Sequence, residues 1–288
     1  MVRRLWMMEV RIARQHGFCF GVRRAIQIAD EFDGPLTTFG PLVHNPYEVK
    51  RLEEKGIAST LEIPEIKTEN ILVRAHGIAP AVMDELKKKG KVVDGTCPLV
   101  KKVHGIAQML DRSGYKILIF GQNNHPETKG TQGHIGNKGI VIENAEEAKQ
   151  FSGSYDKIAL ISQTTEIIEE FKEIESILKE EYPHLRVLDT ICQPTKENQN
   201  AATELARESD LVVVVGGKNS SNTKKLAINC SKITKAVHIE NPEELDDLDY
   251  DGVNVLGLTA GASTPDWLFD RIVAKAEEIC SKINSMAQ

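Results

Sequence analysis

The stretch Lys91-Val-Val-Asp-Gly-Thr-Cys-Pro-Leu-Val100 passes from an apolar strand pattern, through a short polar turn, into the start of a helix. Cys97 lies at this junction, and Pro98 follows it at a position that helices accept because the first helical N–H has no partner. The pattern Asp-x-x-Cys, followed closely by a proline, occurs again in Asp189-Thr-Ile-Cys-Gln-Pro194. A third cysteine lies at a similar junction in His16-Gly-Phe-Cys-Phe-Gly21. The sequence therefore predicts three cysteines that each stand where a strand gives way to a helix.

Polar loops follow the other predicted strands, and all the junctions sort into three sets of three. Each set reads strand, cysteine, helix, strand, loop, helix, strand, loop, helix. The loops cover residues 40–45 and 74–77 in the first set, 121–127 and 162–165 in the second, and 216–222 and 259–264 in the third. Alternating strands and helices predict the α/β fold class, and the recurrence predicts three similar α/β modules.

We expect these modules to span residues 9–90, 91–184 and 185–288 and to form one catalytic unit together. Ligands of open α/β sheets bind beyond the carboxyl ends of the strands, where all the predicted loops and cysteines lie. A pseudo-threefold arrangement would bring them to a common centre. The alternative is three independent Rossmann-like layers whose cysteines are simply buried.

The three junction cysteines, Cys19, Cys97 and Cys192, are candidate metal ligands. The positive end of a helix dipole favours the thiolate, which is the form that binds metals. The paired spacing of a structural zinc site is absent. A cubane iron–sulfur cluster takes four ligands, so three cysteines predict a central [4Fe-4S] cluster with one open iron that can act as a Lewis acid. Catalytic zinc with mixed Cys and His ligands is the alternative.

The two other cysteines, Cys230 and Cys280, lie on apolar stripes with helical spacing. Buried cysteine often behaves as a small hydrophobic residue. We therefore predict that these two belong to the core and bind no metal.

The polar loops favour an anionic substrate. Three histidines lie between a strand and the next helix, and serine and asparagine occupy equivalent places later in the chain. Such donors, together with the free N–H groups of helix starts, form anion sites for which a diphosphate is the natural occupant. The residues are His44, His76, His125, Ser220, Ser221, Asn222 and Ser263. Ordinary helix capping is the alternative for each of them, and no P-loop is present.

One carboxylate is placed to transfer a proton. Glu127 follows His125 by two residues in a loop of otherwise neutral polar groups. Near an anionic substrate its pKa is expected to rise, which would make it an acid, with Thr164 relaying or orienting the proton. A capping role on the first helical turn is the alternative.

Basic residues follow each junction cysteine by four positions, namely Arg23, Lys101 and Lys196. They indicate either a solvated helix face or a docking surface for an electron donor.

Composition excludes several classes of protein. The net charge of −6 over 288 residues argues against a nucleic-acid binder. No apolar run reaches the roughly 20 residues of a membrane span, and the basic residues 1–8 lead into no secretory apolar core. The odd count of five cysteines fits a reducing compartment, which predicts a cytoplasmic protein.

Taken together, the motifs resemble those of the 4-hydroxy-3-methylbut-2-enyl diphosphate reductase family, from about Val10 to the last helix. They are, in order, GFCFGV, VHN, AHG, DGTCPLVKKVH, HPE, SQTT, DTIC, KNSSN and TAGAS. The resemblance implies a [4Fe-4S] cluster on Cys19, Cys97 and Cys192, with Glu127 and Thr164 as catalytic residues. It implies substrate-binding residues at His44, His76, His125, Thr164, Ser220, Ser221, Asn222 and Ser263.

The activity implied by the resemblance is a two-electron reductive dehydroxylation that gives isopentenyl and dimethylallyl diphosphates, the last step of the methylerythritol phosphate pathway. It implies an allylic diphosphate substrate and an electron donor such as ferredoxin or flavodoxin, and we expect a monomer. Two rivals remain open. One is a non-redox hydratase that uses a cluster or zinc only as a Lewis acid. The other is an iron–sulfur sensor, for which a basic DNA-reading element would be expected.

Overall fold

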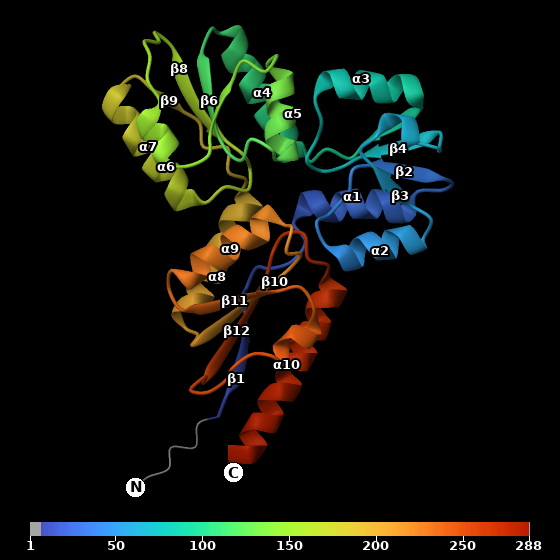
Figure 1. Ribbon diagram of the computed structural model, residues 1–288, viewed down its shortest axis with the longest axis vertical. Coiled ribbons are helices and arrows are strands. Elements are labelled where there is room, and N and C mark those ends of the chain that lie inside the picture. The colour runs from blue at the N-terminus through green and yellow to red at the C-terminus, as the bar shows by residue number, and fades with distance from the viewer. Residues whose placement is uncertain (1–6, 288) are drawn as a thin grey trace. The chain divides into compact units, whose positions relative to one another are not determined.

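The computed structural model describes residues 7–287, so most of the basic stretch 1–8 lies outside the described residues. The chain forms three parallel four-stranded sheets with helices around them (Figure 1). It divides into two compact units. The described part of the terminal unit comprises residues 7–19, 43–49 and 196–287, and the internal unit comprises residues 20–42 and 50–195.

The internal unit contains two of the sheets. The first has the strand order β3-β2-β4-β5, with bounds Ala58–Thr60, Leu36–Phe39, Asn70–Val73 and Lys91–Asp94. The helices of this part of the chain are α1 (Phe20–Glu31), α2 (Pro46–Glu54), η1 (Ile63–Glu65) and α3 (Pro80–Lys89). The second sheet has the order β7-β6-β8-β9, with bounds Ile140–Ile142, Lys116–Phe120, Ile158–Ser162 and Arg186–Val187. Its helices are α4 (Pro98–Arg112), α5 (Pro126–His134), α6 (Ala145–Gln150) and α7 (Ile168–Glu181).

The terminal unit contains the third sheet, in the order β11-β10-β12-β1. The strands span Lys235–Ile239, Leu211–Val215, Val255–Ala260 and Glu9–Ile12. The helices of this part of the chain are α8 (Gln193–Arg207), α9 (Ser221–Ser231), η2 (Pro242–Leu245) and α10 (Asp266–Ala287).

Each sheet has its own core because its two central strands are buried on both faces. In the second sheet, Leu118 and Phe120 pack with residues of α6 and α7, whereas Ile117 and Ile119 pack with residues of α4. Figure 1 shows α6 and α7 on one side of this sheet and α4 on the other. This alternation is the two-residue period of a strand, and such continuous apolar runs are typical of parallel strands covered by helices. The predicted α/β class with three similar modules is confirmed.

The strand that precedes each cysteine belongs to a different sheet from the one that the predicted modules suggest. The strand before Cys97 pairs within the first sheet, the strand before Cys192 within the second, and the strand before Cys19 within the third. Each cysteine therefore follows the edge strand of a sheet whose other three strands come from elsewhere in the chain, namely the preceding part for Cys97 and Cys192 and the C-terminal part for Cys19. The predicted modules instead group that strand with the helix after the cysteine. The three sheets have the same strand order when listed in this way. The predicted module boundaries stay a prediction.

The structure also adds elements that the sequence did not reveal. Each repeat holds a fourth short strand, β3, β7 or β11, followed by a short helix, η1, α6 or η2. These strands are edge strands of three to five residues and are partly exposed. They therefore lack the long apolar run by which a central strand is recognised. Among residues 7–287, no helix has the length and apolar character needed to span a membrane.

Candidate active site

The three junction cysteines share a local geometry. Each directly precedes a helix, which confirms the predicted position: Cys19 precedes α1, Cys97 caps α4, and Cys192 precedes α8. In both Asp-x-x-Cys segments, the aspartate accepts a hydrogen bond from the amide two residues later, at 2.9 Å from Thr96 to Asp94 and at 3.1 Å from Ile191 to Asp189. This turn ends the strand and points the following cysteine into the start of the helix.

The amide of each cysteine donates to the polar loop that follows the central strand with which its own edge strand pairs. The bonds run from Cys97 to the Ala75 carbonyl at 2.9 Å, from Cys192 to the Thr164 carbonyl at 3.0 Å, and from Cys19 to the Ala262 carbonyl at 3.3 Å. Those loops carry His76, Thr164 and Ser263, which are predicted substrate-binding residues. One contact thus recurs three times and joins each cysteine to a predicted binding loop.

The Cys97 thiol packs closely against the backbone of a glycine, Gly21. A Cβ atom added to Gly21 would stand 2.6 Å from Cys97 Sγ, so another residue there would press on the sulfur. Gly21 follows Cys19 by two residues. At Cys192, the Thr195 hydroxyl lies 3.1 Å from the sulfur. In contrast, Cys230 is fully buried, and burial raises the pKa of its thiol to about 11. Cys280 is also buried, so the predicted core placement of both cysteines is confirmed.

The internal unit brings four predicted site residues together in two pairs. The rings of His76 and His125 meet edge to face with centroids 5.4 Å apart. Glu127 is 2 % exposed, and its two carboxylate oxygens accept from the Thr164 amide at 2.6 Å and from the Thr164 hydroxyl at 2.7 Å. His125 accepts from the Glu127 amide at 3.2 Å and so caps α5. The Glu127 carboxylate therefore bonds to a residue of a neighbouring loop and does more than cap the first turn of α5.

The terminal unit gathers the other predicted binding residues. A Cβ atom on Gly217 would overlap the His44 carbonyl oxygen, so the loop after β10 lies directly on the His44 backbone. The Ser263 hydroxyl donates to the Ser220 hydroxyl at 3.1 Å, and Ser220 caps α9. Among the described residues, the Ser221 hydroxyl and the Asn222 amide nitrogen are buried without a hydrogen-bond partner. Buried polar atoms without a partner at a helix start indicate a place for a ligand.

The structure adds His104, which the sequence analysis quoted only as the end of a motif. It is 5 % exposed and lies against Gly77 and Gly130, in the segments that carry His76 and Glu127. Its ring stacks on that of His134 with centroids 3.9 Å apart. Burial lowers the pKa of His104 to about 4, and the neighbouring His134 adds to the shift, so the ring is neutral near pH 7.

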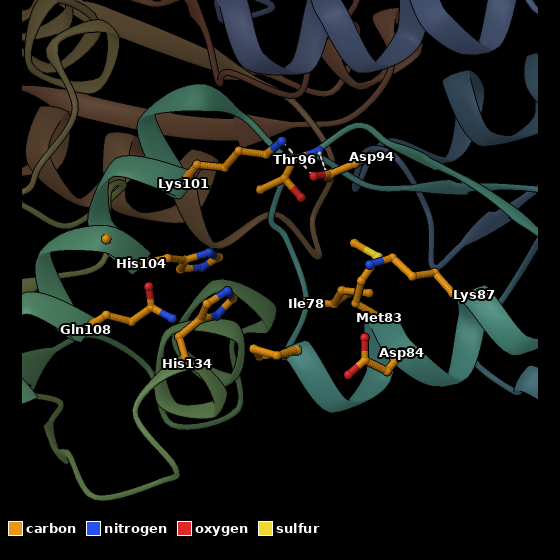
Figure 2. Close-up of a pocket in the computed structure, with 12 residues that line it drawn as sticks. Ile78, Met83, Asp84, Lys87, Asp94, Thr96, Lys101, His104, Gln108 and His134 are labelled. Carbon is orange, nitrogen blue, oxygen red and sulfur yellow. Dashed lines mark hydrogen bonds and ion pairs between the residues drawn. The ribbon is translucent and has the colours of Figure 1, made fainter. Parts of the chain in front are cut away.

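A pocket of about 440 Å³ opens beside these stacked rings. Figure 2 shows His104 and His134 on one side and Ile78 and Met83 facing them from the other. At its edge, Lys101 pairs with Asp94 at 2.6 Å. The pKa of that carboxyl is lowered, because the bonds from Lys101 and Thr96 outweigh the effect of burial. Lys101, one of the three regularly spaced basic residues, is thus engaged in an ion pair.

Gln163 is a second residue that the sequence analysis did not single out. Its side-chain oxygen lies 3.2 Å from the Thr128 hydroxyl, and its amide nitrogen donates to the Thr165 hydroxyl at 2.8 Å. Thr128 and Thr165 are the chain neighbours of Glu127 and Thr164. Gln163 therefore ties together the two segments that form the carboxylate–threonine pair. Only its place in the motif SQTT pointed to it.

Within residues 7–287, no group of three or more His, Cys, Asp and Glu side chains is arranged to hold a single metal ion. A cubane cluster makes a different demand, since it spreads its ligands over several irons.

The sequence from residue 10 to residue 277 matches the family model described as LytB protein. The chain belongs to the LytB protein family. Its relatives include the 4-hydroxy-3-methylbut-2-enyl diphosphate reductase of Campylobacter concisus, which is 43 % identical over 278 residues, covering 94 % of this chain and 100 % of the relative.

Two solved structures resemble this LytB fold over nearly its whole length. The E-1-hydroxy-2-methyl-but-2-enyl-4-diphosphate reductase of Plasmodium falciparum has a TM-score of 0.87 at 30 % identity, covering 93 % of this chain and 87 % of the other. A second structure, of the (E)-4-hydroxy-3-methyl-but-2-enyl diphosphate reductase described as the terminal enzyme of the non-mevalonate pathway, has a TM-score of 0.68 at 38 % identity, covering 94 % and 100 %. The family resemblance is confirmed, and LytB proteins are iron–sulfur dependent.

Proposed function

We propose that this chain reduces 4-hydroxy-3-methylbut-2-enyl diphosphate to isopentenyl and dimethylallyl diphosphates, the reaction of its LytB relatives. In this reaction the allylic C–O bond breaks, two electrons and two protons are taken up, and the oxygen leaves as water. The observation that carries the proposal is the threefold contact between each cysteine amide and a loop with a predicted substrate-binding residue. It supports a site in which cofactor ligands and substrate ligands are held by one arrangement.

Cys19, Cys97 and Cys192 are the proposed ligands of a [4Fe-4S] cluster. Each stands at a helix start, and residue 21 must lack a side chain because a Cβ atom there would lie 2.6 Å from the Cys97 sulfur. When bound, such a cluster supplies electrons singly and an open iron that acts as a Lewis acid. The convergence of the three cysteines on a common centre is part of the proposal.

The diphosphate is proposed to bind through neutral donors. The unpartnered Ser221 hydroxyl and Asn222 amide are ready donors at the start of α9, where free N–H groups and the dipole also favour an anion. The linked Ser220 and Ser263 would position their hydroxyls beside them. The remaining proposed contacts are His44, His76, His125 and Thr164. Held at several points, the diphosphate would orient the carbon chain for reaction.

Glu127 is the proposed proton donor. Its carboxyl group is buried against the amide and hydroxyl of Thr164, so a proton there is shielded from bulk water. A hydroxyl both donates and accepts hydrogen bonds, which allows Thr164 to pass a proton between Glu127 and the bound substrate. Gln163 and His125 would hold this pair in place through the bonds described above.

Three further features belong to the proposal. The electrons come from a small redox protein such as ferredoxin or flavodoxin, the protein works as a monomer, and its compartment is the cytoplasm.

An anaerobic assay tests this function directly. The iron-loaded protein is mixed with the substrate and a chemically reduced electron donor, and the two products are measured by mass spectrometry. We expect both isopentenyl and dimethylallyl diphosphates with the donor and neither without it. Product formation without a donor would favour the hydratase alternative, and no product in either case would refute the proposed reaction.

A further inference from the structure

Arg74 is a buried cation with no visible reason to be buried. It directly follows β4, and its side chain is only 8 % exposed. Among the described residues, its Nε has no hydrogen-bond partner. Buried arginine is normally paired with a carboxylate, because an isolated charge loses the stabilisation that water provides.

No carboxylate compensates this charge within residues 7–287. Burial alone lowers the pKa of Arg74 to about 10, and no acidic side chain contributes to the shift. The guanidinium therefore keeps its positive charge at neutral pH. A buried polar group that stays unsatisfied in a folded protein commonly marks a place for an ion or ligand.

The surrounding backbone makes room for this guanidinium. Gly40, at the carboxyl end of β2, has a φ of +78°, and a Cβ atom there would lie 2.8 Å from Arg74 Nη1. Leu61, which follows β3, lies over the same glycine and is 54 % exposed. An exposed leucine beside a buried arginine reverses the usual pattern of burial. The arrangement lies at the carboxyl ends of β2, β3 and β4, the edge at which parallel sheets bind ligands.

We propose that Arg74 is the charged residue of an oxyanion subsite at the carboxyl edge of the first sheet, and that its ligand is a phosphate group. That group is either the terminal phosphate of the diphosphate substrate or a free phosphate or pyrophosphate ion. Arginine matches phosphate because its planar fork forms two parallel charge-assisted hydrogen bonds. The substrate as the source rests on the proposed function, whereas a free ion does not.

The proposed diphosphate contacts explain why the substrate could need a cation at this place. Those contacts are histidine, serine, threonine and asparagine side chains, none of which carries a fixed positive charge. Arg74 precedes one of them, His76, by two residues. A cation at this edge would offset charge that the neutral donors leave on a diphosphate.

Calorimetric titration of the iron-loaded protein with pyrophosphate tests the subsite. We compare the wild type with Arg74→Met, which keeps an unbranched apolar stem and removes the charge, and with Arg74→Lys, which keeps the charge but loses the fork. Arg112→Met removes an exposed arginine of α4 as a matched control. We expect Arg74→Met to weaken pyrophosphate binding about 10- to 100-fold, Arg74→Lys to weaken it less, and Arg112→Met to leave it unchanged.

Thermal unfolding in chloride buffer shows whether weaker pyrophosphate binding in Arg74→Met comes from a folding defect. Without oxyanion, Arg74→Met should unfold at the same or a higher temperature than the wild type, because an unpaired buried charge has been removed. Pyrophosphate should raise the unfolding temperature of the wild type and of Arg112→Met more than that of Arg74→Met. Equal pyrophosphate affinity in Arg74→Met and wild type would overturn the subsite. So would a less stable Arg74→Met without oxyanion, which would show that the folded chain itself satisfies the guanidinium.

Steady-state kinetics distinguishes the two sources of the phosphate group. If Arg74→Met raises KM for the substrate about tenfold or more and leaves kcat near that of the wild type, the subsite holds the terminal phosphate of the substrate. If pyrophosphate binding is lost and KM stays unchanged, the subsite takes a free oxyanion. A wild-type protein that binds pyrophosphate through Arg74 but reduces no substrate would refute the proposed function and keep the subsite.

Discussion

Among single residues, Glu127 and Thr164 carry out the proposed proton transfer. The carboxylate is almost fully buried, and both of its oxygens are held by one residue of a different loop. Because this arrangement fixes the direction of the carboxyl group, a small chemical change there tests its role without disturbing the fold.

Replacing Glu127 with Gln removes the acid and keeps the shape of the side chain. We expect kcat to fall at least about 100-fold, because a positioned acid contributes on that order, while iron content stays at the wild-type level. Turnover of the substrate and iron per chain are the two measurements. Glu146→Gln, on the exposed face of α6, serves as the control and should change neither. Wild-type turnover in Glu127→Gln would show that another group donates the proton.

His104, which lines the pocket in Figure 2, makes the stability of the fold depend on pH. Burial, reinforced by His134, lowers its pKa from 6.5 to about 4, so the folded state binds this proton less readily than the unfolded state. Its contribution to stability is therefore complete above pH 6.5 and is lost as the pH falls toward 4, by about 3 kcal/mol.

The replacement His104→Gln should therefore flatten the loss of stability between pH 7 and pH 4 by about 3 kcal/mol. Urea unfolding of the iron-free protein at a series of pH values measures this. His184→Gln alters an exposed histidine and should leave the acid-induced loss as in the wild type. An unchanged pH profile in His104→Gln would mean that the ring is not held neutral.

Cys230 provides the matching test for the cysteines. Its thiol is fully buried and lies 3.8 Å from the Ala202 carbonyl oxygen. Replacing it with Ser should lower the free energy of unfolding by about 1–3 kcal/mol, because a hydroxyl replaces an apolar thiol, and should leave iron content unchanged. Loss of iron in Cys230→Ser would move this residue from the core to the cofactor site.

The residue scale also shows where sequence reasoning ends. The predicted pairing of Glu127 with Thr164 agrees with the structure because their segments follow β6 and β8, which are neighbouring strands of one sheet. The burial of His104 and Arg74 could not be predicted, because it depends on glycines far away in sequence that come close only in the fold, such as Gly130 and Gly40.

At the scale of elements, the recurring device is a strand, a cysteine and a helix. The helix start places the thiol in a positive field, and the cysteine amide anchors the junction to a neighbouring loop. In the first copy, helix α1 can begin against the Cys97 thiol only because residue 21 is glycine.

Gly21→Ala tests this close approach. The new methyl group would meet Cys97 Sγ at 2.6 Å, so we expect the sulfur to shift and the iron content per chain to fall by at least half. Gly105→Ala, in α4, is the matched control. Its added Cβ meets nothing within 4 Å, and it should keep full iron content and gain up to about 1 kcal/mol of stability. Full iron content in Gly21→Ala would show that the space at the sulfur is not needed.

Element order and the positions of the cysteines were predictable from the sequence because central strands and helix starts have strong local signals. The sheet to which each cysteine strand belongs was not. Chain order suggests that a strand belongs with the helix that follows it. Instead, β5 pairs with β4 and β9 with β8, each from the preceding part of the chain, and β1 pairs with β12 from the C-terminal part. Such pairing is a tertiary choice that a single strand of two to four residues does not encode locally.

At the scale of the whole molecule, the proposed ligands are divided between the two units. The terminal unit holds Cys19 with the serine and asparagine donors, and the internal unit holds Cys97 and Cys192 with the proposed acid. Under the proposed function, both units supply ligands to one cluster and one substrate. We therefore expect a single [4Fe-4S] cluster on three cysteines whose fourth iron is open to the substrate.

The Mössbauer spectrum of the iron-57-enriched protein, prepared without oxygen and recorded with and without substrate, distinguishes this cluster from its alternatives. We expect about four irons per chain in one cluster, with one iron distinct from the other three and altered when the substrate is added. A colourless protein with stoichiometric zinc, or four equivalent irons that the substrate leaves unchanged, would contradict it.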